Sequence, residues 1–196
     1  MSQRGSLATR CATVKHVSEQ SAWQGEDQPV EVVLYDPAWP ERFEREREVL
    51  QRVLGPLVAG GIHHIGSTAV PGLAAKPIID VMVGVRSLDE ARPSFDGLAA
   101  IGYCYWPHRP GLHWFCKPSP SERTHHLHLI EPGHPQFAAR LAFRDYLRTH
   151  AEAADAYAAL KIELATRYRD DREGYTEAKA EFVRSIVERA LGRQID

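Results

Sequence analysis

The stretch IHHIGSTAVPGLAAKPIIDVMVGV, at residues 62–85, gives the strongest indications of both fold and chemistry. The residues around Asp80 are apolar and mostly β-branched, which predicts a largely buried strand. An ionised carboxylate in such a strand is costly unless a cation, a hydrogen-bond donor or a metal ion compensates it. Earlier in the stretch, Gly66, Ser67 and Thr68 predict a turn whose backbone N–H groups and two hydroxyls can receive phosphate oxygens. We therefore expect this turn and Asp80 to share one pocket.

Composition limits the classes of protein that the chain can represent. Its 196 residues, 43% hydrophobic and 26% charged, suffice for one domain with a core. The net charge of -2 gives no general attraction to nucleic acid, so any phosphate recognition is expected to be local. Cys11, Cys104 and Cys116 lack metal-finger spacing, and the N-terminus has no apolar signal core, which favours a reduced, cytoplasmic protein. The apolar runs are too short and too interrupted to cross a membrane.

The elements that support the central stretch follow from hydrophobic periodicity and turn residues. Polar composition predicts that residues 1–29 form a disordered N-terminal tail. Asp36 is expected to cap the first helix, and Gly60 and Gly61 are expected to end it. The predicted strands lie at residues 30–35, 62–65, 78–83, 102–106, 112–117 and 125–130. The predicted helices lie at residues 36–58 and 87–100, with about three more between residues 135 and 191.

The order of these elements predicts a mixed α/β (α+β) domain rather than a regular βαβ series. The chain has neither a G-x-G-x-x-G sequence opening a helix nor a G-K-[ST] sequence, so Rossmann and P-loop folds are excluded. We expect a small sheet with an antiparallel edge, covered on one face by helices. Residues 30–192 should form a single domain, with a sheet core at 30–133 and a helical cap at 134–192.

Four motifs together resemble the GrpB family. They are HIGSTAVPGLAAKPIIDVMVGV at residues 64–85, THHLHLIE at 124–131, FRDYLRTH at 143–150 and DREGYTEAKAEFV at 171–183. The similarity runs from about residue 30 to residue 191. This resemblance implies a nucleotidyltransferase-like fold, in which helices pack on a mixed β-sheet and a helical region follows at the C-terminal end. It implies a candidate site but no settled substrate.

Nucleotidyl transfer needs a turn that holds the triphosphate and two or three carboxylates that place Mg²⁺ ions. In the light of the resemblance, Gly66 and Ser67 match the turn, and Asp80 matches the first carboxylate. The superfamily pattern implies a second acid two residues later, on the same strand face. Met82 stands there, and a thioether is a poor Mg²⁺ ligand. Asp80 is thus the predicted catalytic residue and metal ligand, with Mg²⁺ as the candidate cofactor, and the question of catalysis stays open.

Histidines offer another set of partners for Asp80. Strand alternation predicts that His126 and His128 lie on one face of their strand and that His125 lies on the other. Together with Asp80, the first two could bind a transition metal. The alternatives are that they hydrogen-bond to Asp80 and the backbone, or that they donate to a phosphate.

Lysines are the expected partners of an anionic ligand. Lys76 precedes Pro77 at the start of the Asp80 strand, where its ammonium group could reach Asp80 or a ligand. Lys161 and Lys179 each follow a tyrosine by four residues, so each shares a helix face with an aromatic ring. Exposure of both lysines to solvent is the alternative. The predicted ligand-binding residues are Gly66, Ser67, Thr68, Lys76, His126, His128, Lys161 and Lys179.

Two further groups are expected to be structural. Trp106, Trp114 and Phe115 are predicted to lie in the sheet core, with a base-stacking platform as the alternative. Arg144 and Asp145 are predicted to form an internal ion pair or a helix-terminus contact.

The interpretation that accounts for these features is a GrpB-like protein that binds a nucleotide or another phosphorylated small molecule. Metal-dependent nucleotidyl transfer is one extension of this interpretation, and a non-catalytic ligand-binding or regulatory module on the same fold is the alternative. A purely structural interaction protein would leave Asp80, Lys76 and the histidines unexplained.

Overall fold

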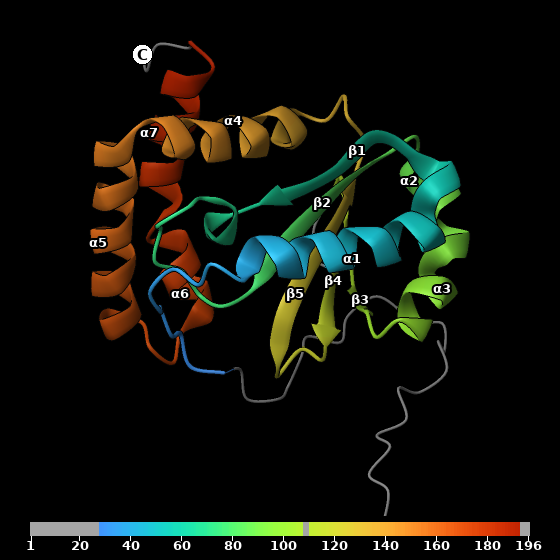
Figure 1. Cartoon of the computed structure of the whole chain (residues 1–196), viewed down its shortest axis with the longest axis horizontal. Coiled ribbons are helices and arrows are strands. Elements are labelled where there is room, and N and C mark those ends of the chain that lie inside the picture. The colour runs from blue at the N-terminus through green and yellow to red at the C-terminus, as the bar shows by residue number, and fades with distance from the viewer. Residues whose placement is uncertain (1–27, 108–109, 193–196) are drawn as a thin grey trace, which may run out of the picture.

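The fold is built on a five-stranded sheet with the strand order β1-β2-β5-β4-β3 (Figure 1). The computed structural model describes residues 28–107 and 110–192, so the predicted tail at residues 1–29 lies almost wholly outside the described residues. Strands β2 and β5 are parallel and the other neighbouring pairs are antiparallel, which confirms the predicted mixed sheet. The strands are β1 (Val58–Ile65), β2 (Ile79–Val85), β3 (Cys104–Trp106), β4 (His113–Pro118) and β5 (Arg123–Ile130).

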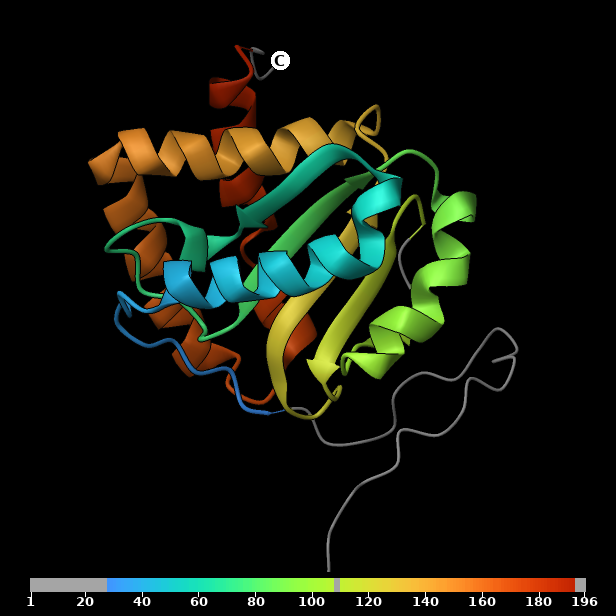
Figure 2. The same ribbon diagram turned by 45° about the vertical axis from the view of Figure 1, so that its right-hand side comes forward.

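Helix α1 (Trp39–Leu54) crosses one face of the sheet, with the short helices α2 (Leu88–Ala91) and α3 (Phe95–Ala100) beside it (Figures 1 and 2). Alternate side chains of β2 and β5 point toward α1, because successive residues of a strand face opposite sides. Apolar burial between these layers holds the helices on the sheet. The core on this face includes Trp39, Phe43, Leu50, Leu54, Ile79, Val81, Val83, Val85, Leu98, Phe115, Leu127 and Leu129.

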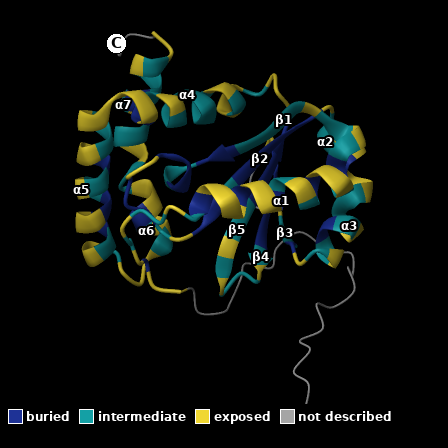
Figure 3. Ribbon diagram, in the orientation of Figure 1, coloured by how far each residue is buried: buried dark blue, intermediate teal, exposed yellow. Residues whose placement is uncertain are grey.

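The C-terminal helical region approaches the opposite face of the sheet. It consists of α4 (Pro135–Thr149), α5 (Ala151–Arg167), α6 (Arg172–Glu177) and α7 (Ala180–Ala190). Helix α4 packs through Phe137 and Leu141 on a second, smaller core that includes Met82 and Ile130. The second face is therefore partly covered, which corrects the expectation of helices on one face only. Figure 3 shows buried strands between helices whose outer surfaces are exposed.

Residues 30–35, predicted as a strand, are not assigned to a strand of the sheet, and their strand-type pairing is one isolated bridge, between Val33 and Ala75. Their apolar residues are accommodated by packing rather than by a ladder. Val30 is buried against Leu164 and Tyr175, and its backbone N–H donates to the carbonyl of Arg169. This segment therefore straps the helical region to the start of α1.

Gly60 and Gly61 lie within β1 and do not end the first helix, contrary to expectation. Helix α1 ends at Leu54 and continues as a 3₁₀ turn at Gly55–Leu57. The two backbones of β1 and β2 approach closely, and a Cβ placed on Gly84 would lie 2.5 Å from the Cα of Gly60. A glycine is needed here for close packing, a role that looks the same in the sequence as a helix stop.

Two predicted helical segments are more divided than expected. Pro93 lies in a 3₁₀ turn (Arg92–Ser94) that separates α2 from α3, because proline lacks the N–H that an α-helix needs. The region at residues 135–191 holds four helices rather than about three. Breaks separate α4 from α5 at His150, α5 from α6 before Arg172, and α6 from α7 at Ala178 and Lys179. Among the described residues, no helix is long and apolar enough to span a membrane.

Candidate functional site

Strand register places Asp80 near the start of β2, on the face opposite α1. Asp80 lies across from Ile65 of β1 on one side and from His126 of β5 on the other. His125, the neighbour of His126, instead faces α1, where its Nε2 lies 3.9 Å from a carboxylate oxygen of Glu46. The alternation predicted for these histidines is therefore confirmed.

Asp80 and His126 form a hydrogen-bonded pair, with 2.8 Å between Oδ1 and Nδ1. Burial opposes ionisation of Asp80, but the His126 hydrogen bond and the charges of Lys76 and Arg140 keep its pKa below the ordinary value. Burial lowers the pKa of His126, although Asp80 opposes that effect. The pair is thus an ionised carboxylate and a neutral imidazole that donates from Nδ1. Nε2 of His126 is buried and has no hydrogen-bond partner in the described part of the chain.

His128 adds a third polar group beside this pair. Its Nε2 lies 4.0 Å from Oδ1 of Asp80. Its Nδ1 lies 3.1 Å from Nη1 of Arg140 on α4. Because a guanidinium can only donate, Nδ1 of His128 accepts and Nε2 carries the proton that faces Asp80. These contacts match the hydrogen-bonding alternative that the sequence left open for both histidines.

The small-residue turn lies directly against Asp80. Gly66 has φ = 71°, and a Cβ at this position would lie only 2.4 Å from Oδ2 of Asp80. Glycine is required both by this left-handed conformation and by the close approach. Thr68 is buried, and its hydroxyl donates to the carbonyl of Ile78 at 3.1 Å. His64 Nε2 lies 3.0 Å from the same hydroxyl oxygen, so Thr68 connects the end of β1 to the residue before β2. Burial lowers the pKa of His64 to about 4, so the ring is neutral at pH 7.

Helix α4 holds the two ends of this turn. Arg144 donates from Nη1 to the carbonyl of His64 at 2.9 Å, and Arg148 donates from Nε to the carbonyl of Ala69 at 2.9 Å. The ion pair predicted between Arg144 and Asp145 is present, with N–O distances of 2.7 and 3.0 Å. Sequence reasoning missed Arg148, although it belongs to the FRDYLRTH motif that supported the family resemblance.

Three lysines approach the same region from the loop before β2 and from the helical region. Lys161 on α5 is only 2% exposed, donates to the carbonyl of Ala74, and lies 4.6 Å from the ring centre of Tyr157. Lys76 and Lys179 both lie over the ring of Tyr175, at 5.2 and 3.8 Å. Burial, together with the neighbouring lysine charges, lowers the pKa of Lys161 and of Lys179 to about 7. The alternative in which Lys161 and Lys179 extend into solvent is therefore wrong.

The tryptophans and the phenylalanine of β3 and β4 divide between the two faces. Phe115 lies in the core beneath α3, as predicted. Trp106 and Trp114 are cross-strand neighbours on the opposite face. Trp114 lies 5.0 Å from the ring of His126, centre to centre, and the Arg123 guanidinium lies 5.6 Å from the Trp114 ring. Both pack in the smaller core, as predicted, and they also form an aromatic wall of the cavity beside the Asp80 pair.

A cavity of about 1030 Å³ brings these groups together. Asp80 and all eight predicted ligand-binding residues line it, and both tryptophans contribute to its wall. Sequence reasoning did not select the arginines at the cavity, because arginines are frequent in this chain and only the tertiary fold brings these ones to the site. They are Arg123, Arg140 and Arg172.

The side chains around Asp80 do not fit a Mg²⁺ site. Met82 occupies the position of the expected second carboxylate, is fully buried, and packs in the apolar core of this face. Asp80 already uses Oδ1 for His126, and its Oδ2 lies against Gly66. Across the described ranges, no three His, Cys, Asp or Glu side chains are grouped so that they could hold a metal ion. Magnesium prefers near-octahedral oxygen ligands, which a single occupied carboxylate does not supply.

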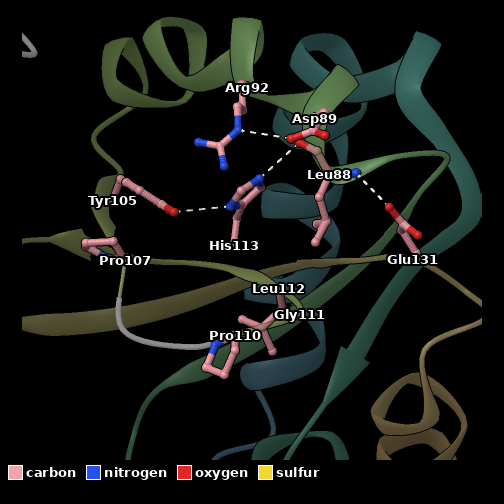
Figure 4. Close-up of a pocket in the computed structure, with 10 residues that line it drawn as sticks. All are labelled: Leu88, Asp89, Arg92, Tyr105, Pro107, Pro110, Gly111, Leu112, His113 and Glu131. Carbon is pink, nitrogen blue, oxygen red and sulfur yellow. Dashed lines mark hydrogen bonds and ion pairs between the residues drawn. The ribbon is translucent and has the colours of Figure 1, made fainter. Parts of the chain in front are cut away.

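A smaller cavity of about 410 Å³ lies on another side of the molecule, beside α2 and the β3–β4 connection (Figure 4). Its polar groups are paired with one another. His113 contacts the Tyr105 hydroxyl at 3.2 Å and the Leu88 carbonyl at 3.0 Å, and Arg92 pairs with Asp89 at 3.3 Å. The lining of this cavity holds two acids and one arginine and so gathers no positive charge, which leaves the larger cavity as the candidate site.

The sheet and the turn beside Asp80 define a class of protein, the nucleotidyltransferase-like fold. A crystal structure of a poly(U) polymerase shares this fold with a TM-score of 0.50 and 15% identity, over 75% of this chain and 50% of that one. Within this class the chain belongs to the GrpB family, whose model, described as GrpB protein, matches residues 29–189. The family resemblance seen in the sequence is therefore confirmed.

Two relatives show how far the similarity extends. The crystal structure of the conserved protein GrpB from Enterococcus faecalis has a TM-score of 0.77 and 37% identity, and the match covers 83% of this chain and 98% of that one. The UPF0157 protein YqkA of Bacillus subtilis is 40% identical over 163 residues, which are 82% of this chain. The match covers 47% of that protein, so this chain spans about half the length of that relative.

Proposed function

We propose that the chain binds a nucleotide or another phosphorylated small molecule in the 1030 Å³ cavity. The observation that carries the proposal is the excess of positively charged side chains around this cavity, in a chain whose net charge is -2. Three of the five lysines of the chain line this one cavity. Phosphate oxygens are the ligands that ammonium groups, guanidinium groups and a glycine turn have in common.

The positive side chains that line the cavity outnumber the acids: they are Lys76, Arg123, Arg140, Lys161, Arg172 and Lys179, against Asp80, Glu173 and Glu177. Within the described residues, no carboxylate lies close enough to Lys161 or Lys179 to form an ion pair. Like charges gathered in a partly desolvated cavity repel one another and depress each other's pKa. An anion bound among them offsets this repulsion, so the arrangement favours a ligand that carries negative charge.

The aromatic wall supports a ligand that has a planar group as well as a phosphate. Trp106 and Trp114 line the cavity together with the three lysines. Stacking on a tryptophan contributes about 1–3 kcal/mol per nucleobase at single-stranded nucleic-acid sites. A nucleotide offers both chemistries in one small molecule.

Binding without catalysis is the form of this proposal that the site favours. Nucleotidyl transfer at a two-metal centre needs paired carboxylates, and Met82 occupies the place of the second one. The fold is compatible with both functions, since unrelated activities share common folds. The choice therefore depends on Asp80 and Met82 rather than on the fold.

The test is a thermal-shift screen of nucleotides and other phosphorylated small molecules, followed by calorimetric titration of the strongest hit. A ligand at a hundred times its dissociation constant should stabilise the protein by about 2.7 kcal/mol. Lys179→Ala should weaken binding by about 1–3 kcal/mol, the range for a hydrogen bond to a charged group. Arg184→Ala removes an exposed positive charge from α7, the helix that follows Lys179, and should leave affinity unchanged.

Two results would count against the proposal. One is a complete absence of stabilisation by any phosphorylated compound. The other is equal weakening by Lys179→Ala and Arg184→Ala, which would indicate a general charge effect rather than a pocket. Pyrophosphate release from nucleoside triphosphates, measured with the same protein, separates transfer from binding.

A further inference from the structure

We infer that the cavity takes a phosphoryl group that carries no metal ion, such as a phosphate monoester, and that its lysines replace the metal as the source of positive charge. This inference rests on the proposed function and specifies its ligand class. It follows from two independent features of the site, one on the sheet and one on the helical region.

On the sheet, Asp80 is a single carboxylate with one oxygen already hydrogen-bonded, because Met82 stands where a second acid would be. Oδ1 accepts from His126 at 2.8 Å, with His128 a further 4.0 Å neighbour, and Oδ2 lies against Gly66. A Mg²⁺ ion bridges a protein carboxylate and the phosphate oxygens when it mediates binding. A bridge through Asp80 would have one carboxylate beside the His126 hydrogen bond and no second acid on β2 to complete the oxygen ligands.

On the helical side, the lysines are already placed for a bare anion. Lys76 and Lys179 lie over the same ring of Tyr175, and Lys161 lies over Tyr157. The rings hold these ammonium groups by cation–π contact among the side chains that line the cavity. A hydrated Mg²⁺ would add two positive charges to a cavity in which lysines and arginines already outnumber acids, so a metal-bound ligand is electrostatically disfavoured.

The chemistry of phosphates turns this electrostatic preference into selectivity. Magnesium chelates diphosphates and triphosphates through oxygens of adjacent phosphoryl groups but associates weakly with a single phosphate. A site made of lysines therefore competes poorly for a Mg²⁺–triphosphate and well for a phosphomonoester, whose dianion remains metal-free. The ligand class is a small molecule with a terminal phosphate monoester.

Calorimetric titration with two inorganic probes tests this inference, each in EDTA and in excess MgCl₂. Pyrophosphate should bind in EDTA, and excess Mg²⁺ should weaken its binding several-fold because the metal chelates the probe. Orthophosphate, which chelates poorly, should bind equally in both buffers. Lys161→Met preserves most of the side-chain volume and should weaken pyrophosphate binding in EDTA at least tenfold.

Two further variants keep the result interpretable. Lys179→Met should show the same loss as Lys161→Met, and it decides the outcome if Lys161→Met fails to fold. Arg189→Met removes an exposed charge from α7 and should not change the affinity. Pyrophosphate binding that requires Mg²⁺, or that survives both lysine replacements, overturns the inference while leaving phosphate binding itself intact. Absence of binding in every buffer overturns the proposed function, and the inference falls with it.

Discussion

The two faces of the sheet carry two different polar clusters, and consecutive residues of β5 lead into them. His125 faces the Glu46 cluster, which we define as Glu46, Tyr103, Lys117 and His125. There the Glu46 carboxylate accepts from the Tyr103 hydroxyl at 2.9 Å and from the Lys117 ammonium. His126 faces the large cavity, where three lysines and three arginines outnumber the three acids of the lining.

The difference is charge balance around a cavity, not the number of charged groups. In the Glu46 cluster, one buried acid satisfies one lysine and one hydroxyl, and neither of the two described cavities reaches it. A cluster of this kind pins α1 to the sheet and leaves nothing for a ligand to do. Lys161 and Lys179 at the cavity form no such ion pair within the described residues, which makes them the better candidates for binding.

The largest effect is expected from a substitution that removes the acid of the Glu46 cluster. Glu46→Ala should lower the free energy of unfolding by about 3 kcal/mol, because it leaves the Lys117 ammonium without its anion. Glu48→Ala, on the same helix but exposed, should change stability by less than about 0.5 kcal/mol. Urea denaturation measures both variants. If Glu46→Ala also abolished phosphate binding in protein that remained folded, the two faces would not be functionally separate.

The next effect concerns how stability depends on pH. The pKa of Lys161 and of Lys179 is lowered to about 7 from 10.5, so between these values the unfolded chain binds more protons than the folded one. Stability should therefore rise with pH from 7 to about 9.5, as both lysines lose the protons that the unfolded chain still binds. Above pH 10 the raised pKa of Tyr175, about 12 because of burial, acts in the opposite direction.

Denaturation of wild type and Lys161→Met across this pH range checks the dependence. The variant should show a shallower rise, because it has lost one of the two titrating lysines. The Glu48→Ala control should keep the full slope. Parallel curves for wild type and Lys161→Met would show that Lys161 is charged at pH 7 and hydrated more than its burial indicates.

The smallest effect sharpens the role of α4 in the cavity. Arg148→Gln removes the donor to the Ala69 carbonyl and should cost about 1 kcal/mol of stability. It should also weaken phosphate binding a few-fold, because Arg148 positions the end of the Gly66 turn without reaching the ligand. Arg148→Lys keeps the charge but not the guanidinium geometry, and should recover only part of the affinity. Full recovery by lysine would assign the effect to charge rather than to positioning.

Much of the site could be predicted because it lies on regular elements. Strand periodicity placed Asp80, Met82, His126 and His128 on one face, since alternation in a strand does not depend on distant contacts. Helix periodicity likewise paired Lys161 with an aromatic ring. These local rules, together with the GrpB motifs, were sufficient to bring the predicted residues to one cavity.

The features that sequence reasoning missed depend on tertiary contacts. Arg148 acts on a carbonyl 79 residues away in the chain, and no local pattern marks such a contact. Residues 30–35 have a strand-like composition, but they form one isolated bridge and pack against α5 and α6 instead of joining the edge of the sheet. The break between α6 and α7 occurs in a run of good helix formers, where packing outweighs propensity.

The close contact between the backbones of β1 and β2 at Gly60 and Gly84 predicts which mutations would abolish function. A side chain at Gly84 would strike the backbone of Gly60, and one at Gly60 would come within 2.6 Å of Pro132. A screen for loss of function would therefore recover alleles at both positions, mixed with alleles from the cavity. Thermal melting distinguishes the two groups, because substitutions at Gly60 or Gly84 should unfold the protein, whereas substitutions of cavity residues should leave it folded. Loss of function at these glycines would therefore reflect the contact between two backbones and would not identify them as binding or catalytic residues.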